Sequence, residues 1–303
     1  MAILNYNGRT HLAYSVPSVL AQDYPSAAVV VVDNASTDGS VEWVRRTFPN
    51  VGVLSLPANV GYSALNVAVD GDERAEFVLL MTNDIVLEPR ALSHAVEVAS
   101  AHSDVGIIGF EMLGAQRWVD PSALAEASAR MDRPALRDAE WIEGAAMLVR
   151  RRLLGDLGGI DAAYFAYCDE DDLQWRVRWA GYRCVKITTP VWHNAGRNAL
   201  ATVPRHSAYL QMRNYIRYRT KNWGAWEGIK AAAWIAYRAC CPGIPVDRTS
   251  PYESRHRPFS PLRNAAIVAQ AWAWNVLHAR ETLRARRETR ARIRRVREER
   301  ERA

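Results

Sequence analysis

Four consecutive carboxylates, at residues 169–172, form the group in this chain best suited to acid–base chemistry. Like charges close together raise the pKa of a carboxylate toward the range in which it can accept a proton from a hydroxyl. The run (Asp169, Glu170, Asp171 and Asp172) also opens a predicted helix that ends at Gly181, and acidic residues stabilise a helix N-terminus. The residues themselves therefore leave a general base and a solvated helix end as alternatives.

A second polar cluster, residues 33–38, separates a predicted buried strand at 27–32 from a predicted helix at 40–47. Asp33 stands where a carboxylate can accept a hydrogen bond from a nucleotide base or a ribose hydroxyl. Ser36 and its neighbours can cap the following helix. The same residue types also dominate turns that bind nothing, so both interpretations stay open at this point.

Further candidates follow other strand-like runs. Asp84 comes after residues 77–81, and a carboxylate there can hold a divalent cation that offsets the charge of a diphosphate. His193 comes after residues 184–187, although a lone histidine is more often structural. Before residues 147–149, Gly144 permits close backbone approach, and Trp141 could stack on a sugar or simply be buried.

Alternating strands and helices must position these residues. Short apolar runs alternate with helix-like stretches, which predicts a mostly parallel sheet with helices on both faces. Ligands in such folds bind at the carboxyl ends of the strands, where the polar residues above lie. The predicted strands are residues 2–4, 27–32, 51–55 and 77–81, and the predicted helices are residues 11–22, 40–47, 63–69 and 90–102.

Bulk properties narrow the class of protein. With 303 residues, 49% hydrophobic and 24% charged, the chain suits one large globular domain with an extension. The four cysteines (Cys168, Cys184, Cys240 and Cys241) form no CxxC pair, which favours reduced thiols in a cytoplasmic protein. No apolar run reaches the length of a membrane span. Only four residues precede Asn5, whereas strands usually have about 5–6, so we expect the natural start to lie upstream.

The positive charge is concentrated at the C-terminal end. Residues 280–303 contain 11 Arg and 5 Glu, a surplus of six that equals the formal net charge of +6. We expect two units, a domain at residues 1–225 and a basic helical extension at 226–303, with a linker at about residues 242–261. The extension is predicted to be one helix over residues 262–296 with an apolar stripe at Leu262, Ala265, Ala269, Trp272, Val276, Ala279 and Leu283. Its basic end is either solvated or docked on an anionic membrane. Because the rest of the chain is neutral, nucleic acid is not expected as a partner.

Three N-terminal segments together resemble family 2 glycosyltransferases, and within them the rhamnosyltransferase-like group. They are residues 4–8 (LNYNG), residues 31–40 (VVDNASTDGS) and residues 59–62 (NVGY) with Asn66. The likeness covers roughly residues 2–225 and implies the GT-A fold of nucleotide-diphospho-sugar transferases. It implies a nucleotide site made of Asn5, Asn7, Asp33, Asn34, Ser36, Asn59, Gly61 and Asn83.

The same resemblance assigns the chemistry. Asp84 matches the carboxylate that ends the family's DxD-like metal segment, with Thr82 at the position of the first Asp, and His193 would lie near the metal. The implied cofactor is a divalent cation, Mg²⁺ or Mn²⁺. Glu170 stands at the position of the base, where the family commonly has Asp. Asp169 is the alternate base and Asp172 the third catalytic candidate, while Trp141 and Gly144 would face the acceptor.

The predicted function is therefore inverting, metal-dependent transfer of a sugar from a nucleotide-diphosphate donor, with dTDP-rhamnose as candidate, to a glycan or lipid-linked glycan. The predicted location is the cytoplasm, with peripheral contact at the inner face of the membrane. The alternative is a catalytically inactive nucleotide-sugar-binding scaffold. A nucleotidyltransferase would need a Gly-rich phosphate loop, and a processive synthase a Gln-x-x-Arg-Trp motif; the sequence has neither, so single-sugar addition is expected.

Overall fold

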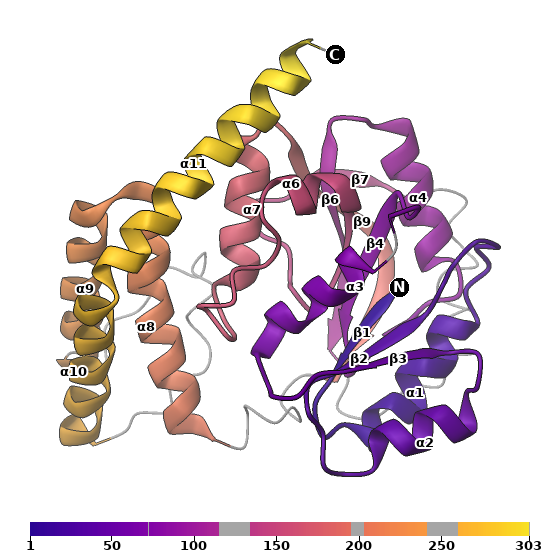
Figure 1. The fold of residues 1–303 in the computed structure, drawn as a ribbon, viewed down its shortest axis with the longest axis horizontal. Coiled ribbons are helices and arrows are strands. Elements are labelled where there is room, and N and C mark those ends of the chain that lie inside the picture. Colours follow the sequence, from indigo (N-terminus) through magenta and orange to yellow (C-terminus); the bar gives the residue numbers. More distant parts are fainter. Residues whose placement is uncertain (72, 115–133, 195–202, 241–259, 303) are drawn as a thin grey trace.

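Four parallel strands form the N-terminal half of the sheet in the computed structural model, which describes residues 1–71, 73–114, 134–194, 203–240 and 260–302. They lie in the order β3 (Gly52–Ser55), β2 (Val30–Asp33), β1 (Ala2–Asn5), β4 (Phe77–Thr82) (Figure 1). The register places Asn5 beside Asp33 on one side, and Leu4 beside Thr82 on the other. The polar residues that follow these strands therefore meet at one edge of the sheet, as predicted.

The second half of the sheet is mixed. Beyond β4 the order continues β8 (Ala146–Arg150), β6 (Val105–Gly114), β9 (Arg183–His193), β5 (Ile85–Leu87), and β7 (Leu136–Asp138) pairs with β9. β8, β5 and β7 run antiparallel to their neighbours, whereas β6 and β9 are parallel. This arrangement folds the ends of β5 and β9 back toward the end of β4.

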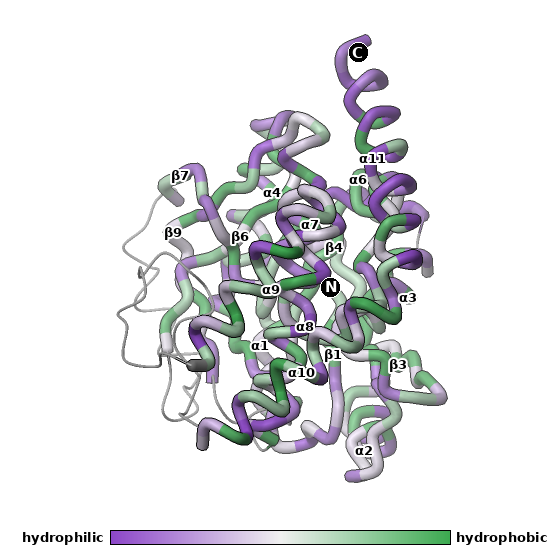
Figure 2. Tube along the Cα trace, turned by 90° about the vertical axis from the view of Figure 1, so that its left-hand side faces the viewer, coloured by the Kyte–Doolittle hydropathy of each residue, from purple (hydrophilic) through white to green (hydrophobic). Residues whose placement is uncertain are grey.

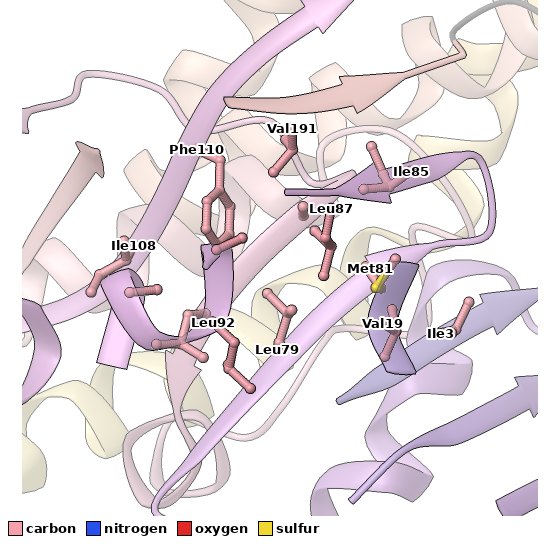
Figure 3. Packing of buried hydrophobic residues seen from close by; sticks show 14 of the residues in the cluster. Ile3, Val19, Leu79, Met81, Ile85, Leu87, Leu92, Ile108, Phe110 and Val191 are labelled. Carbon is pink, nitrogen blue, oxygen red and sulfur yellow. The ribbon is translucent and has the colours of Figure 1, made fainter. Parts of the chain in front are cut away.

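Two apolar layers cover the two faces of the sheet, because successive side chains of a strand point to opposite faces. On one face, Leu79 and Met81 of β4 pack with β5 and with the helices α1 (Arg9–Leu20) and α4 (Ala91–Ala101) (Figure 3). On the other face, Leu80 packs toward α3 (Asn66–Asp70), α6 (Arg151–Asp156) and α7 (Asp169–Trp179). α2 (Ser40–Thr47) and the short helix η1 (Gly61–Leu65) complete the N-terminal half.

The C-terminal helices differ from the prediction. α8 (Pro204–Trp223), α9 (Ala225–Cys240) and α10 (Pro261–Leu277) share a third apolar cluster, so the predicted boundary at residue 225 falls between two helices that pack together. The predicted single helix is wrong, since α10 and α11 (Ala279–Arg302) meet at His278 and diverge (Figure 1). The predicted linker lies almost wholly outside the described residues. No helix in the described ranges has both the length and the apolar character needed to cross a bilayer.

The predicted apolar stripe is also wrong. Leu262 and Val276 are 85% and 75% exposed, whereas the buried residues of α10 are Ile267, Val268 and Ala271. The error has a simple cause. α10 packs against both α8 and α9, and the contact face that these helices select lies beside the stripe that hydrophobicity alone predicts.

The arginines of α11 bind the ends of other helices. Arg286 Nη1 donates to the Lys221 carbonyl at 2.9 Å and Arg290 Nη2 to the Asn222 carbonyl at 3.2 Å, both in the last turn of α8. Arg300 donates to the carbonyl of Gly181, just beyond α7. The final carbonyls of a helix lack intrahelical partners and carry partial negative charge. Part of the basic surplus therefore holds α11 to the body, a role that the sequence did not reveal.

Candidate active site

Asn5 is the centre of the polar edge beyond β1 and β2. Its Nδ2 lies 2.9 Å from Asp33 Oδ1 and 2.9 Å from Ser40 Oγ, and its Oδ1 accepts from Asn83 Nδ2 at 2.8 Å. A Cβ atom at Gly8 would lie 1.9 Å from Asn83 Nδ2, so this close approach requires glycine. The three predicted nucleotide residues Asn5, Asp33 and Asn83 thus form one bonded group.

Asn7 and Ser36 fasten the two loops after β1 and β2 to each other. Ser36 N donates to Asp33 Oδ2 at 2.9 Å, and Asn7 N donates to Ser36 Oγ at 2.8 Å. Thr37 N returns a bond to Asn7 Oδ1 at 2.8 Å. Asn7 adopts φ 48°, a left-handed conformation that Asn tolerates better than most residues. Both oxygens of Asp33 therefore shape the turn, and contact of Asp33 with a nucleotide remains a prediction.

The loop before η1 is tied to the same edge. Asn34 Nδ2 donates to the Gly61 carbonyl at 2.9 Å, and Gly61 N donates to Asn59 Oδ1 at 3.0 Å. Gly61 has φ +70°, and a Cβ there would lie 1.8 Å from the Phe165 carbonyl oxygen. The structure therefore brings all eight predicted nucleotide residues to one region and joins that region to the loop that precedes α7.

Asp84 and His193 meet as the sequence suggested. β5 pairs Ile85 with His193 of β9, and His193 Nε2 lies 3.3 Å from Asp84 Oδ2. Thr82 Oγ1 donates to Asp84 Oδ1 at 2.5 Å. Burial by itself would raise the pKa of Asp84, but the hydrogen bond and charge of His193, with the Thr82 bond, outweigh it and hold the pKa below its ordinary value. The anionic form that a metal requires is therefore favoured.

This pair fits two neighbouring ligands of one divalent cation. Bonds of about 2.1 Å at right angles place two ligand atoms roughly 3 Å apart, close to the separation of the carboxylate and imidazole atoms. Among the described residues, no cluster of three or more His, Cys, Asp or Glu is arranged to hold a metal. The remaining positions would fall to diphosphate oxygens and water, as is usual for Mg²⁺.

Glu170 and Asp169, the two candidate bases, begin α7 beside the predicted acceptor segment. The half-buried Glu170 side chain lies against Gly144, where a Cβ would be 3.1 Å from Glu170 Cβ. Burial raises the pKa of Glu170 well above its usual value, and the charges of Asp169 and Glu143 add to the shift. Burial also raises the pKa of Asp169 to about 6. Such carboxylates are suited to accept a proton near neutral pH.

The metal candidates and the base candidates belong to one connected site. Thr82, which binds Asp84, also donates its backbone N–H to the Ala145 carbonyl at 2.9 Å. Gly144, the residue before Ala145, contacts Glu170. The backbone hydrogen bond between Thr82 of β4 and Ala145 therefore links the metal candidates, Asp84 and His193, to Glu170, the candidate base.

Tyr62 lies in the site, although the sequence indicated no role for this last residue of the NVGY segment at 59–62. Its hydroxyl donates to the carbonyl of Gly144. Burial raises its pKa, and the nearby charges of Asp169 and Glu170 raise it further, so the phenol stays protonated. Its place at the end of a segment expected to bind the nucleotide was the signal in the sequence that could have identified it. His11 of α1 was also missed; its charge contributes to the lowered pKa of Asp84.

The loop before α7 is held in an unfavourable backbone conformation. Phe165, Tyr167 and Cys168 all have φ between 63° and 69°, a region that non-glycine residues rarely adopt. Asn214 Nδ2 donates to the carbonyls of residues 164, 166 and 167 at 2.7–3.0 Å, and Arg213 Nη2 to those of residues 163 and 164. Arg213 and Asn214 therefore fix the loop that presents the base.

Asp172, the third catalytic candidate, lies in a buried ion-pair network, and its catalytic role stays a prediction. It is fully buried, with Oδ2 2.9 Å from Arg176 Nε and 2.9 Å from Lys221 Nζ, and it accepts from Asn222 at 3.0 Å. Burial would raise its pKa, but the charges of Lys221 and Arg176 outweigh it and lower the pKa. Asp172 lies two positions after Glu170 in α7, a rotation of roughly 200° around the helix axis, so Asp172 points inward while Glu170 points toward Gly144.

Trp141 lies beside this site without a settled role. Lys186 Nζ is 5.7 Å from the centre of its ring and also 2.6 Å from Glu143 Oε2. Ile142, the next residue, exchanges two hydrogen bonds with Gln174 of α7. The buried indole Nε1 has no hydrogen-bond partner within the described residues. Stacking of Trp141 on an acceptor sugar stays a prediction.

Comparison with known proteins decides the family. Residues 1–128 match the sequence model of glycosyl transferase family 2. This chain carries a glycosyl transferase family 2 domain. It is 27% identical over 261 residues to N-acetylglucosaminyl-diphospho-decaprenol L-rhamnosyltransferase of Mycobacterium tuberculosis, covering 74% of this chain and 85% of that relative. The predicted enzyme class and the likeness to rhamnosyltransferases are confirmed.

Solved structures confirm the predicted GT-A fold of this glycosyltransferase. The mannosyltransferase PcManGT of Pyrobaculum calidifontis, solved with GDP-Man and Mn²⁺, has a TM-score of 0.55 and 21% identity, covering 96% of this chain and 84% of its own. TarS 1–349 of S. aureus, solved with UDP-GlcNAc, has a TM-score of 0.58 and 17% identity, covering 98% and 89%. At such identities the likeness concerns the fold alone.

Proposed function

We propose that this family 2 glycosyltransferase adds a single sugar, with inversion, from a nucleotide-diphosphate donor to a glycan or lipid-linked glycan. The observation that carries the proposal is the connected arrangement of Glu170, Gly144 and Asp84. Glu170, whose pKa is raised, lies against Gly144 of the acceptor segment. That segment is hydrogen-bonded to β4, and the metal candidate Asp84 lies just beyond the end of this strand. Base and leaving-group stabiliser thus stand at two ends of one site.

The reaction is a single displacement. An acceptor hydroxyl gives its proton to a Glu170 oxygen, its oxygen forms a bond to the anomeric carbon, and the bond from that carbon to the nucleoside diphosphate breaks with the electron pair on the leaving oxygen. Attack from the side opposite the diphosphate inverts the anomeric configuration. Asp84 and His193 would hold a divalent cation, which supplies charge stabilisation to the departing diphosphate. Asp169 is the alternate base.

The other site residues bind and orient. The edge made by Asn5, Asp33 and Asn83 is proposed to receive the nucleotide, because it lies at the carboxyl ends of parallel strands and is preorganised by internal bonds. Asp172 is proposed to position α7 rather than to react, since all its nearby partners are buried cations and donors. Trp141 and Gly144 would border the acceptor.

Donor and acceptor are inferred from the Mycobacterium tuberculosis relative. Its name specifies transfer of L-rhamnose to N-acetylglucosaminyl-diphospho-decaprenol, and most of both chains align. We therefore propose dTDP-rhamnose as donor and a lipid-linked glycan as acceptor. Cys168 and Cys184 are buried and form no disulfide within the described residues, which is consistent with the cytoplasmic side, where we propose peripheral contact with the membrane. Nucleic acid is not a proposed partner.

The test is a donor panel with the purified protein. Release of nucleoside diphosphate is followed for dTDP-rhamnose, UDP-GlcNAc and GDP-mannose with Mn²⁺, with and without an N-acetylglucosaminyl-diphospho-prenol acceptor. The proposal expects acceptor-stimulated release with dTDP-rhamnose and a product of inverted configuration by NMR. Tight donor binding with neither hydrolysis nor transfer for any donor would instead favour the inactive scaffold.

A further inference from the structure

The outer side of α9 and α10 exposes large apolar side chains that no described part of the chain covers. Leu277, Trp226 and Ile229 are 80%, 66% and 58% exposed. Isolated exposed apolar residues are ordinary, but many of them gathered on two adjacent helices indicate an interaction surface. The members of this group, called here the outer helical face, are Trp226, Ile229, Trp234, Tyr237, Leu262, Trp272, Val276 and Leu277.

The two helices present this face together. Trp272 Nε1 donates to the Ala232 carbonyl at 3.3 Å, which fixes α10 beside α9. Their opposite sides pack on α8 through buried residues that include Ala231, Ile235 and Ile267. Figure 1 places α9 and α10 outermost in the helical layer, and the view in Figure 2 turns this side of the molecule toward the reader. The exposed residues therefore belong to one surface and not to two unrelated helices.

The composition of this face is that of a membrane interface. Trp and Tyr are enriched at the boundary between lipid chains and headgroups, where the ring is buried and the polar edge stays wet. Cations border the aromatic groups: Lys230 Nζ lies 5.8 Å from the Trp226 ring centre and the Arg238 guanidinium 5.9 Å from that of Trp234. Such a belt of aromatic, aliphatic and basic residues on helices that do not cross the bilayer is typical of peripheral binding.

Charge complementarity selects an anionic lipid surface as the occupant. Residues 225–240 and 261–277 contain Lys230, Arg238 and Arg263 but a single acid, Glu227. Glu227 is bonded to Arg219 and lies 2.7 Å from Lys230, so its charge is already balanced. A second copy docked through the same face would bring like charges together.

We propose that the outer helical face docks this enzyme on an anionic membrane and is the main membrane-binding surface of the chain. The arginines of α11 are then secondary, because several of them bind the carbonyl ends of α7 and α8. The inference rests on the proposed use of a lipid-linked acceptor, since a transferase bound to the surface meets such an acceptor in two dimensions. The membrane contact is thereby placed on the outer helical face and not on the basic helix α11.

The test compares three variants of the full chain by flotation with vesicles of phosphatidylcholine containing phosphatidylglycerol, and with phosphatidylcholine alone. Ile229→Ser/Val276→Ser/Leu277→Ser removes exposed apolar area and is expected to weaken partitioning at least about tenfold. Leu20→Ser/Leu54→Ser changes two leucines that are 47% and 40% exposed on the N-terminal half, and it should bind like the wild type. Arg287→Gln/Arg294→Gln on α11 should reduce binding by only a few-fold.

Several results would overturn the proposal. Unchanged flotation of the triple variant, or loss of binding in the α11 variant alone, would return the contact to the tail. A wild-type dimer that the triple variant converts to a monomer, without vesicle binding, would make the face an interface between copies. If the triple variant does not fold, quenching of wild-type fluorescence by brominated lipid, reduced in Trp226→Phe, decides the same question.

The proposed reaction and the proposed docking surface can each be refuted without refuting the other. The triple variant should keep wild-type nucleoside diphosphate release with a short-chain, water-soluble acceptor, because none of its substitutions touches the site. Glu170→Gln should float like the wild type. Vesicle binding without transferase activity would refute the proposed reaction and leave the docking surface intact.

Discussion

Glu170 lies directly against Gly144, and the absent side chain of the glycine leaves the space that the carboxylate uses. A Cβ at position 144 would come within 3.1 Å of Glu170 Cβ and 3.5 Å of its carboxyl carbon. The carbonyl of the same glycine accepts the Tyr62 hydroxyl. The acceptor segment and the base are therefore positioned by each other, so a change in either should move both.

Gly144→Ala should lower kcat about tenfold or more while leaving donor affinity unchanged, because the added methyl displaces the carboxylate from the acceptor hydroxyl. Initial rates over donor concentration separate the two constants. Gly155→Ala, at a glycine of α6 where a Cβ would meet no atom of the described residues within 4 Å, is the matched control. Wild-type kcat in Gly144→Ala would show that this contact does not position the base.

Glu170→Gln should reduce transfer by roughly 10²–10⁴-fold, the usual contribution of a general base, since the amide keeps the shape but cannot take a proton. Donor binding by calorimetry should survive. Asp171→Asn, in the same acidic run, serves as control. If Glu170→Gln remains active and Asp169→Asn does not, the base is Asp169.

The pH profile of kcat/KM should show an acidic limb. The base works only when ionised, so activity should fall as the pH drops through the pKa, which burial raises to about 6 for Asp169 and well above its usual value for Glu170. In Asp169→Asn a neighbouring negative charge is lost, and the limb should move to lower pH. A limb near the ordinary glutamate pKa in the wild type would show that burial and the neighbouring carboxylate do not raise the pKa of the base.

Much of the N-terminal site was predictable, for a physical reason. Parallel strands carry their carboxyl ends to one edge, so Asn5, Asp33 and Asp84 could be brought together from strand order alone. Short polar motifs at strand ends specify local turns, and their bonds involve near neighbours in the sheet. Most strand and helix assignments of the first hundred residues followed from the same alternation, but the short strand β5 was not predicted.

What was missed depends on long-range packing. The acidic run shows no sign that Asp172 would point toward Lys221, 49 residues away, while Glu170 turns to the acceptor segment. Similarly, α10 packs against α8 and α9, which the spacing of apolar residues within α10 cannot specify. The arginines of α11 looked like a solvated or membrane-bound tail because the helix ends that they bind are remote in sequence.

Substitution of either metal candidate, Asp84 or His193, should weaken metal binding. Asp84→Asn and His193→Gln should each weaken Mn²⁺ affinity, measured by electron paramagnetic resonance in the presence of nucleoside diphosphate, by about tenfold or more. His102→Gln should have no effect. If chelation leaves the transfer rate unchanged and both variants bind Mn²⁺ normally, the pair is a structural ion pair and the cation assignment is wrong.

Lys221→Met should destabilise the protein by about 3–5 kcal/mol, because it removes a buried cation from the buried carboxylate of Asp172 and the partly buried carboxylate of Asp161. Lys221 Nζ lies 2.8 Å from Asp161 Oδ2 and 2.9 Å from Asp172 Oδ2. Unfolding in urea measures the loss of stability. The control is Arg297→Met, which removes an exposed ion pair with Glu301 and should change the free energy of unfolding by less than about 1 kcal/mol.

The same network predicts the direction of the pH dependence. Burial by itself would raise the pKa values of Asp161 and Asp172, but Lys221 and the neighbouring arginines hold them below the ordinary carboxylate value. Their stabilising contribution is therefore present above the unfolded-state pKa of about 4 and is lost as the pH falls toward the lower folded-state values. Lys221→Met should flatten this acid-side loss, because without the ammonium the folded-state pKa values rise back toward the unfolded ones. An equally steep loss in the variant would show that Lys221 does not set them.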